Sequence, residues 1–332
     1  MKILFTICSN NYLAQAKVLL QSSKEKTSDY LFYLFVVDVQ NMNIDYDSFG
    51  FSKIVFIRDL LPESIDLLIS KYNLIELNTS IKATAFKYII SQNVGSEIVI
   101  YLDPDIQIFS SLNLLEKILQ SKSIVLSPHI TSPIEIDNFS PNENIFLNYG
   151  LYNLGFIALS SQNIEAKIFL NWWEERLLTQ CFINLKEGLF VDQLWINLVP
   201  LMFQDVFIIK DLGYNMAPWN LHERHLGYQN DKLMVNERHQ LVFYHFSSID
   251  FENKANISKP YYSRFNFLNR PDLFRIYSTY FELLEKNENK YYSKFKCELY
   301  PPVETENEIT TSNKFEFHDI FFRIISRINK LF

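Results

Sequence analysis

The stretch Ser96-Glu97-Ile98-Val99-Ile100-Tyr101-Leu102-Asp103-Pro104-Asp105-Ile106 decides how the rest of the chain is interpreted. Its segment 98–102, rich in β-branched and aromatic side chains, predicts a buried strand. Pro104 cannot continue a hydrogen-bonded ladder, so the chain should turn there and hold the carboxylates of Asp103 and Asp105 close together. Such a pair is typical of a solvated turn, but it also favours a divalent cation, which suits a diphosphate. Open α/β sheets bind ligands at the carboxyl ends of their strands, which is where this pair lies, so the cation site is kept as an interpretation beside the solvated turn.

The composition indicates a globular protein with a large core. The 332 residues are 48% hydrophobic, and the length fits one large α/β domain with an appendage or two modest domains. There are 31 Lys and Arg against 38 Asp and Glu, giving a net charge of −7, and no block of clustered basic residues in the first 300 positions. These charges argue against a nucleic-acid partner.

Cysteine usage and the N-terminus bear on the compartment. Cys8, Cys181 and Cys297 are scattered and lack C-x-x-C spacing, which argues against a disulfide framework or a zinc site. The apolar run of residues 1–8 is too short for a signal peptide or a membrane span, and it predicts a core strand instead. We therefore expect a cytoplasmic protein.

Strands and helices alternate along most of the chain. The apolar patterns predict strands at 3–8, 31–37, 53–57, 98–102, 123–126, 152–160 and 206–209. They predict helices at 12–22, 75–92, 112–120 and 162–180, a helix after Pro62, and one that opens at 188–197. This alternation implies a parallel, doubly wound sheet, followed by a hairpin of 233–235 with 241–246.

The loop after the first strand has no G-x-G-x-x-G, which disfavours a Rossmann dinucleotide site. Ser9, Asn10 and Tyr12 can still hold a nucleotide base through hydrogen bonds and stacking. On the helix predicted before Asp103, either Lys82 or Lys87 can reach a phosphate, or both can belong to a solvated face.

Further polar groups lie in the second half of the chain. Gly155, within the strand predicted at 152–160, marks a bulge or a close backbone approach, and Asn153 beside it offers a donor and an acceptor. Asp192 and Gln193 fall in the first turn of the next predicted helix, where an aspartate also stabilises the helix dipole. His245, flanked by aromatic residues, is either a core histidine or a ligand. The segment 127–149 lacks periodicity and carries three prolines, so it predicts a mobile lid or acceptor loop.

Five motifs in sequence order give a resemblance to a known family. They are Ile100-Tyr101-Leu102-Asp103-Pro104-Asp105, Asn153-Leu154-Gly155, Asp192-Gln193-Leu194-Trp195, Asn215-Met216-Ala217-Pro218-Trp219-Asn220-Leu221 and His245-Phe246-Ser247. Over roughly residues 1 to 250, the chain resembles bacterial GT-A glycosyltransferases of glycosyltransferase family 8 and glycogenin. The resemblance implies a Rossmann-like, mostly parallel α/β sheet flanked by helices.

The resemblance also implies a site. Asp103, Asp105 and His245 match the ligands of a manganese ion that holds the diphosphate of a nucleotide sugar, and a mixed carboxylate and imidazole set suits Mn²⁺ better than Mg²⁺. Ser9, Asn10 and Tyr12 match the nucleotide loop, although an acidic residue common in that loop is absent. Lys87 matches a basic position before the metal motif. The resemblance places the remaining donor-site matches at Asn153, Gly155, Asp192, Gln193 and Asn220.

The implied activity is transfer of a sugar from a nucleotide sugar, with uridine as the expected base, to a hydroxyl acceptor with retention of configuration. The acceptor can be a glycan, a lipid-linked molecule or a protein. Two rivals are a sugar nucleotidyltransferase, which commonly has a Gly- and Arg-rich loop that is absent after this first strand, and a non-catalytic nucleotide-sugar-binding protein.

We expect three parts: a catalytic domain over 1–250, a helical extension over 251–304, and a linker with an amphipathic helix over 305–332. In the last part, Arg323, Arg327 and Lys330 recur at helical spacing opposite apolar residues. Such a helix can lie on an anionic membrane at the inner face, or it can pack on the catalytic domain or on a second subunit.

Overall fold

The strand predicted at 98–102 is β4 (Ile98–Leu102), and all five of its residues are buried. The computed structural model describes residues 1–300, so the tail predicted over 305–332 lies outside the described residues. Within residues 1–300, seven strands form the main sheet: β1 (Lys2–Cys8), β2 (Tyr30–Val36), β3 (Lys53–Phe56), β4, β6 (Ile124–Pro128), β7 (Tyr152–Ser160) and β10 (Val206–Ile208).

The sheet has the order β10-β6-β7-β4-β1-β2-β3. The strands β4, β1, β2 and β3 run parallel, and β10 is parallel to β6. β7 is antiparallel to both of its neighbours, β4 and β6. The predicted mostly parallel α/β sheet is confirmed, with β7 as the strand that runs the other way.

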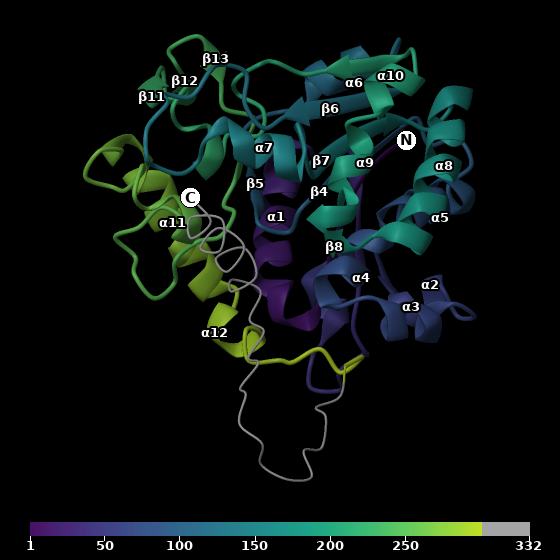
Figure 1. Ribbon diagram of the computed structural model, residues 1–332. Helices are drawn as coiled ribbons and strands as arrows, with labels where there is room; N and C mark the ends of the chain where they lie inside the picture. The colour runs from purple at the N-terminus through teal and green to yellow at the C-terminus, as the bar shows by residue number, and fades with distance from the viewer. Residues whose placement is uncertain (301–332) are drawn as a thin grey trace.

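Helices cover both faces of this sheet (Figure 1). Phe5 of β1 faces α4 (Leu74–Ser80), α5 (Lys82–Gln92) and α8 (Ile164–Gln180) in a core that includes Phe86 and Trp173. The adjacent Leu4 belongs to the core on the other face, with Leu19 of α1 (Leu13–Lys26) and residues of α6 (Asn113–Leu119). This alternation follows from the two-residue period of a strand, and it explains why buried strands of this sheet are apolar on both faces.

The remaining elements are short or lie after the main sheet. The other α-helices of the described chain are α2 (Ile57–Leu60), α3 (Ile65–Lys71), α7 (Glu143–Tyr149), α9 (Gln193–Ile196), α10 (Val199–Met202), α11 (Phe274–Lys286) and α12 (Asn289–Tyr292). The short strands there are β5 (Ile106–Ile108), β8 (Ile183–Asn184), β9 (Leu189–Phe190), β11 (Leu226–Gln229), β12 (Lys232–Val235), β13 (His239–Gln240) and β14 (Phe243–His245).

The helix predicted over 75–92 is two helices. α4 begins with a capping box, in which Asn73 and Glu76 bond each other's backbone N–H groups. The helix is interrupted at Ile81, whose φ of −90° and ψ of 0° depart from helical geometry, and Lys82 starts α5. The interruption changes the direction in which the lysines of this region project.

The predicted hairpin of 233–235 with 241–246 is wrong in most of its second arm, because that arm begins at His239 and only Leu241 of the predicted residues bonds back, to Leu233 at 2.8 Å. β12 pairs with β11 and with β13. The chain then diverges, because Val242 donates its backbone N–H to the Gly213 carbonyl at 2.8 Å, and β14 pairs antiparallel with β5. The pairing of β14 with β5 matters for the site, since β5 directly follows Asp105.

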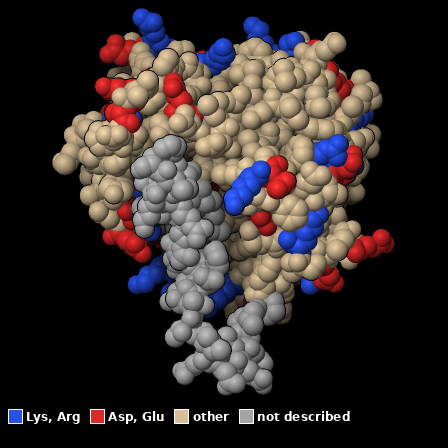
Figure 2. Space-filling view, viewed as in Figure 1, with Lys and Arg blue, Asp and Glu red and all other residues tan. Residues whose placement is uncertain are grey.

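The region after β14 packs on α1 through α11 and α12, with Tyr277 and Tyr280 in the same core cluster as Leu13. The ring of Phe246 stacks on Tyr280 with centroids 3.9 Å apart. The division of the chain at residue 250 remains a prediction. On the face of the described residues drawn in Figure 2, basic and acidic side chains are interspersed without a basic cluster.

Candidate active site

A cavity of about 280 Å³ opens at the carboxyl ends of β1 and β4. Its wall includes Ser9 and Tyr12 after β1, Lys82 at the start of α5, and residues of β7, β9 and β14. This is the position at which parallel α/β sheets bind ligands, because the loops that leave adjacent strands diverge there.

Three potential metal ligands meet in the cavity wall. Asp103, Asp105 and His245 each offer one ligand atom, and these atoms all lie within 4.8 Å of one another. The His245 Nε2 lies 2.9 Å from Asp105 Oδ1 and 3.7 Å from Asp103 Oδ2. The two aspartate side chains are 28% and 20% exposed, so an ion from solvent can reach them, whereas the histidine is buried.

The backbone explains why these residues meet. Asp103 donates its N–H to the Gly155 carbonyl at 2.8 Å, and the chain turns at Pro104 so that Ile106 N–H returns to the Asp103 carbonyl at 3.1 Å. β14 then pairs with β5 in a register that places His245 opposite Ile106. Phe246 N–H donates to the Asp105 carbonyl at 2.9 Å, which ties the two ligand-bearing segments together.

Gly155 is required by this arrangement. A Cβ added there would lie 2.4 Å from His245 Cε1 and 2.8 Å from Asp103 Oδ2. The sequence predicted a bulge or a close backbone approach at Gly155, and the atoms that approach it are instead the side chains of the ligand cluster. Only glycine leaves room for both ligands at once.

The electrostatics of the cluster follow from its burial. Burial lowers the pKa of His245, but the carboxylates of Asp105 and Asp103 outweigh it and raise the pKa above its ordinary value. The Tyr101 hydroxyl donates to Asp103 Oδ1 and holds that carboxylate in place. Two carboxylates and an imidazole of this geometry fit a divalent cation such as Mn²⁺ or Mg²⁺.

Lys82 forms a buried ion pair next to the cluster. Its Nζ lies 2.7 Å from Asp192 Oδ2 and 3.9 Å from Asp103 Oδ1, and it donates to the Leu154 carbonyl at 2.9 Å. Burial opposes the charge on Lys82, yet the carboxylates of Asp192 and Asp103 raise its pKa, so the ammonium stays charged. Burial raises the pKa of Asp192, against the opposing effect of Lys82.

The backbone that delivers Asp192 is strained. Val191 has a φ of 41°, which is an outlier for a β-branched residue, and its N–H donates to the Phe182 carbonyl at 3.0 Å. Such outliers persist only where the surrounding structure fixes them. Here they bring Asp192 to Lys82 in the cavity wall.

Asn153 and Gln193 both line the cavity and are held by hydrogen bonds. Gln193 donates from Nε2 to the Tyr149 carbonyl at 2.7 Å and accepts from Leu154 N–H at 3.2 Å. A Cβ at Gly150 would lie 2.7 Å from Gln193 Cγ, so this glycine makes space for the glutamine.

The structure separates the residues expected in the nucleotide loop. Ser9 and Tyr12 line the cavity, and the Ser9 Oγ accepts from Asn78 at 3.3 Å. Asn10 is buried away from the cavity, because its side chain donates to the Val39 carbonyl and accepts from the Tyr46 hydroxyl at 2.7 Å. A contact between the Asn10 side chain and a nucleotide is therefore not supported by the geometry.

Two further predicted donor residues lie elsewhere. Lys87 pairs with Glu174 of α8 and is absent from the cavity wall. Asn220 is fully buried, and its carboxamide makes only internal hydrogen bonds among the described residues. It accepts from Ala217 N–H and donates to the carbonyls of His129 and Asn215. The lysine that reaches the site is Lys82, which the interruption at Ile81 places at the start of α5.

Comparisons with known proteins show what this chain is similar to. No known family profile matches the chain. It is 26% identical to the uncharacterized protein YfnF of Bacillus subtilis over 170 residues, which are 51% of this chain and 55% of YfnF. It is 22% identical to the uncharacterized protein YfnD of the same organism over 263 residues, which are 78% of this chain and 81% of YfnD. The chain thus spans about half the length of YfnF.

A solved structure gives the fold. The galactosyltransferase LgtC, crystallised with donor and acceptor sugar analogs, matches with a TM-score of 0.51 and 16% identity, over 86% of this chain and 96% of LgtC. The chain has the GT-A glycosyltransferase fold. Among the described residues, the GT-A fold includes no helix that is both long and apolar enough to cross a bilayer.

Proposed function

We propose that this protein is a metal-dependent glycosyltransferase that moves a sugar from a nucleotide sugar to a hydroxyl acceptor. The observation that carries the proposal is the convergence of Asp103, Asp105 and His245 at the cavity of a GT-A fold. The late histidine comes from a strand that pairs with β5, so its arrival beside the two carboxylates is specified by long-range topology and not by a local turn.

In this proposal, Asp103, Asp105 and His245 hold the metal ion. When bound, the ion supplies a positive charge that stabilises the diphosphate leaving group. Lys82 favours the ionised form of Asp192, against the effect of burial, and orients it in the cavity wall, and its own ammonium adds positive charge next to Asp103. Ser9 and Tyr12 contact the nucleotide, which we propose to be uridine diphosphate.

Asp192, Gln193 and Asn153 then orient the donor sugar. Asp192 offers a carboxylate to a sugar ring that acquires positive charge in the transition state. Gln193 is fixed by two backbone partners and forms part of a rigid wall. We propose retention of configuration, with the departing phosphate assisting the acceptor hydroxyl, and a glycan or lipid-linked acceptor at a cytoplasmic location.

The test is incubation of the purified protein with a panel of nucleotide sugars and Mn²⁺, followed by measurement of the released nucleoside diphosphate. Release that depends on the metal supports the proposal. Accumulation of pyrophosphate in the presence of a nucleoside triphosphate and a sugar phosphate would indicate a sugar nucleotidyltransferase. Binding of a nucleotide sugar without turnover, with every acceptor class tried, would indicate a binding protein.

The metal assignment has its own test. Asp103→Asn or Asp105→Asn removes one charge from the cluster at nearly unchanged volume, so the fold should persist while metal-dependent nucleotide binding is lost. Titration calorimetry of a nucleoside diphosphate with Mn²⁺ measures this. Unchanged affinity in both variants would refute the metal site. His245→Ala should weaken binding less, because two carboxylates remain.

A further inference from the structure

The orientation of the Asn153 carboxamide is determined by its neighbours. The Gly155 backbone N–H, which can only donate, points to Asn153 Oδ1 at 3.2 Å. The Asn215 Nδ2 donates to the same oxygen at 3.0 Å. The oxygen of Asn153 is therefore occupied by two donors, and its amide nitrogen faces the other way.

The amide nitrogen of Asn153 meets His129. The Asn153 Nδ2 lies 3.3 Å from His129 Nε2. Because this amide nitrogen can only donate, His129 Nε2 accepts, and the imidazole is the neutral tautomer with its proton on Nδ1. Burial lowers the pKa of His129 to about 3, which agrees with a neutral ring.

One N–H of Asn153 remains available. Among residues 1–300, no acceptor takes the second hydrogen of Asn153 Nδ2, and Asn153 lines the cavity. An amide N–H in a cavity wall is a donor for a hydroxyl or phosphate oxygen of a bound molecule. Without the contact to His129, the carboxamide would be held by its oxygen alone, and the direction of its amide nitrogen would be less sharply defined.

His129 itself is rigidly held. Its backbone N–H donates to the Leu151 carbonyl at 2.9 Å, and its carbonyl accepts from Asn220 at 3.2 Å. Its ring stacks on Phe146, with centroids 5.2 Å apart, and meets Trp219 edge-on at 5.4 Å. The buried Asn220 thus supports the site indirectly, by fixing the backbone of His129.

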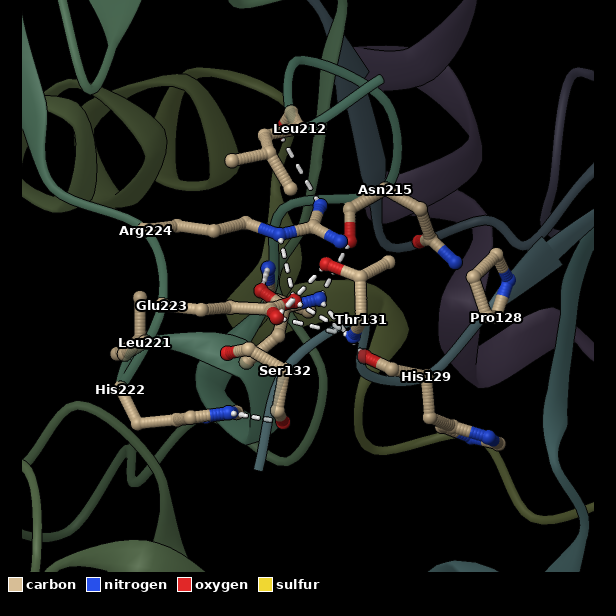
Figure 3. A network of polar contacts seen from close by, with 12 residues as sticks. Pro128, His129, Thr131, Ser132, Leu212, Asn215, Leu221, His222, Glu223 and Arg224 are labelled. Atoms are coloured by element: carbon tan, nitrogen blue, oxygen red, sulfur yellow. Dashed lines mark hydrogen bonds and ion pairs between the residues drawn. The ribbon is translucent and has the colours of Figure 1, made fainter. Parts of the chain in front are cut away.

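A network of hydrogen bonds from His222, Glu223 and Arg224, which we call the brace, fixes the segment that follows His129 (Figure 3). Glu223 accepts from the backbone N–H of Thr131, at 2.9 and 3.1 Å, and from its hydroxyl at 2.8 Å. The buried Arg224 donates to the Tyr214 carbonyl at 2.6 Å and to the Leu212 carbonyl at 3.1 Å. The segment that bears His129 is therefore anchored to the one that bears Asn215.

We propose that His129 is a positioning residue, which fixes the Asn153 carboxamide so that its free N–H meets the sugar part of the donor. This inference rests on the proposed glycosyltransferase function. It assigns a role to a residue that does not itself line the cavity.

The experiment compares His129→Gln with His129→Met, two side chains of similar size of which only glutamine carries a strong acceptor, since a thioether sulfur accepts weakly. Titration calorimetry measures binding of a nucleotide sugar and of the matching nucleoside diphosphate, and turnover gives kcat and KM. His129→Met should weaken nucleotide-sugar binding about tenfold, the effect of one hydrogen bond, and leave the diphosphate unchanged. His129→Gln should recover most of that loss.

His222 provides a matched control. It belongs to the same brace, with its Nε2 3.1 Å from the Ser132 carbonyl, but it does not line the cavity. His222→Met should therefore bind and turn over donor like the unaltered protein. In the Asn153→Ala background, His129→Met should cause no additional loss, because the group that it positions is gone.

The outcomes are distinct. If His129→Met binds the nucleotide sugar like the unaltered protein, or weakens the diphosphate by the same factor, the positioning role is wrong. It is also wrong if Gln and Met behave alike, or if the losses from Asn153→Ala and His129→Met multiply. An unaltered protein that neither binds nor turns over any nucleotide sugar would refute the proposed function instead.

Discussion

At the scale of single residues, Gly155 gives the sharpest prediction. In Gly155→Ala, the new methyl group would collide with His245 and Asp103, so the two ligands must move apart. We expect metal-dependent binding of a nucleoside diphosphate to fall by at least tenfold, since one ligand is displaced. Gly227→Ala is the control, because nothing lies within 4 Å of a Cβ added there. Equal affinities of the two variants in calorimetry would contradict the geometry.

The buried pair of Lys82 and Asp192 gives a second prediction at this scale. Removing one partner alone, as in Lys82→Met, leaves the other charge buried, which costs roughly 3–5 kcal/mol of unfolding free energy. The double variant Lys82→Met/Asp192→Leu should recover much of this loss, although its activity should be lost. Urea unfolding of the unaltered protein and of the two variants checks this, and a double variant that is less stable than Lys82→Met would refute it.

His129 predicts a pH dependence of stability. Its pKa is about 3 in the folded protein, below the ordinary value of 6.5, so the unfolded chain binds the proton first as pH falls. The contribution of His129 to stability is complete above pH 6.5 and declines by about 1.4 kcal/mol per pH unit between there and pH 3. Urea unfolding of the unaltered protein and of His129→Gln across pH 4 to 7 measures the difference. A constant difference between the two would contradict the assignment.

The residues that sequence reasoning placed wrongly were decided by helix orientation, burial and long-range contacts, which spacing along the chain does not report. Lys82 and Lys87 are both on helix 82–92, and their five-residue spacing puts them on different faces, so that Lys82 meets Asp192 whereas Lys87 meets Glu174. Asn10 and Asn220 look like ligand-binding amides, but burial has turned them into internal hydrogen-bonding groups. His129 was missed because its partner, Asn153, lies on another strand, so no spacing along the chain relates the two.

At the scale of elements, the segment 127–149 remains a predicted lid or acceptor loop, now with a defined base. Glu223 anchors Thr131 near the start of the segment, and α7 forms its C-terminal part. Between them, Ile136 is 98% exposed and Phe139 is 50% exposed. We expect the amides of 135–142 to exchange fast and to slow when a nucleotide sugar binds, with those of α7 less affected. Hydrogen exchange followed by mass spectrometry tests this, and equally slow exchange with and without donor would contradict it.

Local elements were predictable where the sequence has strong periodicity. The buried strands of the main sheet were recognisable from continuous runs of β-branched and aromatic residues. The pairing of β14 with β5 was not predictable in this way, because strand partners are chosen by long-range packing. The ligand triad could be named from its resemblance to a family, but the reason that its members meet required the sheet topology.

At the scale of the whole molecule, one core cluster of the described chain includes residues on both sides of the predicted boundary at residue 250. Tyr277 and Tyr280 of α11 lie in one core cluster with Leu13 of α1, and the Tyr244 and Tyr277 hydroxyls are 3.1 Å apart. A fragment of residues 1–250 should therefore lack cooperative thermal unfolding, whereas residues 1–300 should retain it. Near-ultraviolet circular dichroism during heating distinguishes the two, and a cooperative transition in the shorter fragment would show that the extension is an independent part.

The ligand triad also divides the chain into two contributions. Asp103 and Asp105 precede the exposed loop around Phe139, whereas His245 and Gly155 follow it. Cutting the chain at that loop would yield two pieces, neither of which contains all three residues of the ligand triad. On the proposed function, a divalent cation bound by the triad would then join the two pieces. A split version of this protein could serve as a sensor whose reassembly reports the metal.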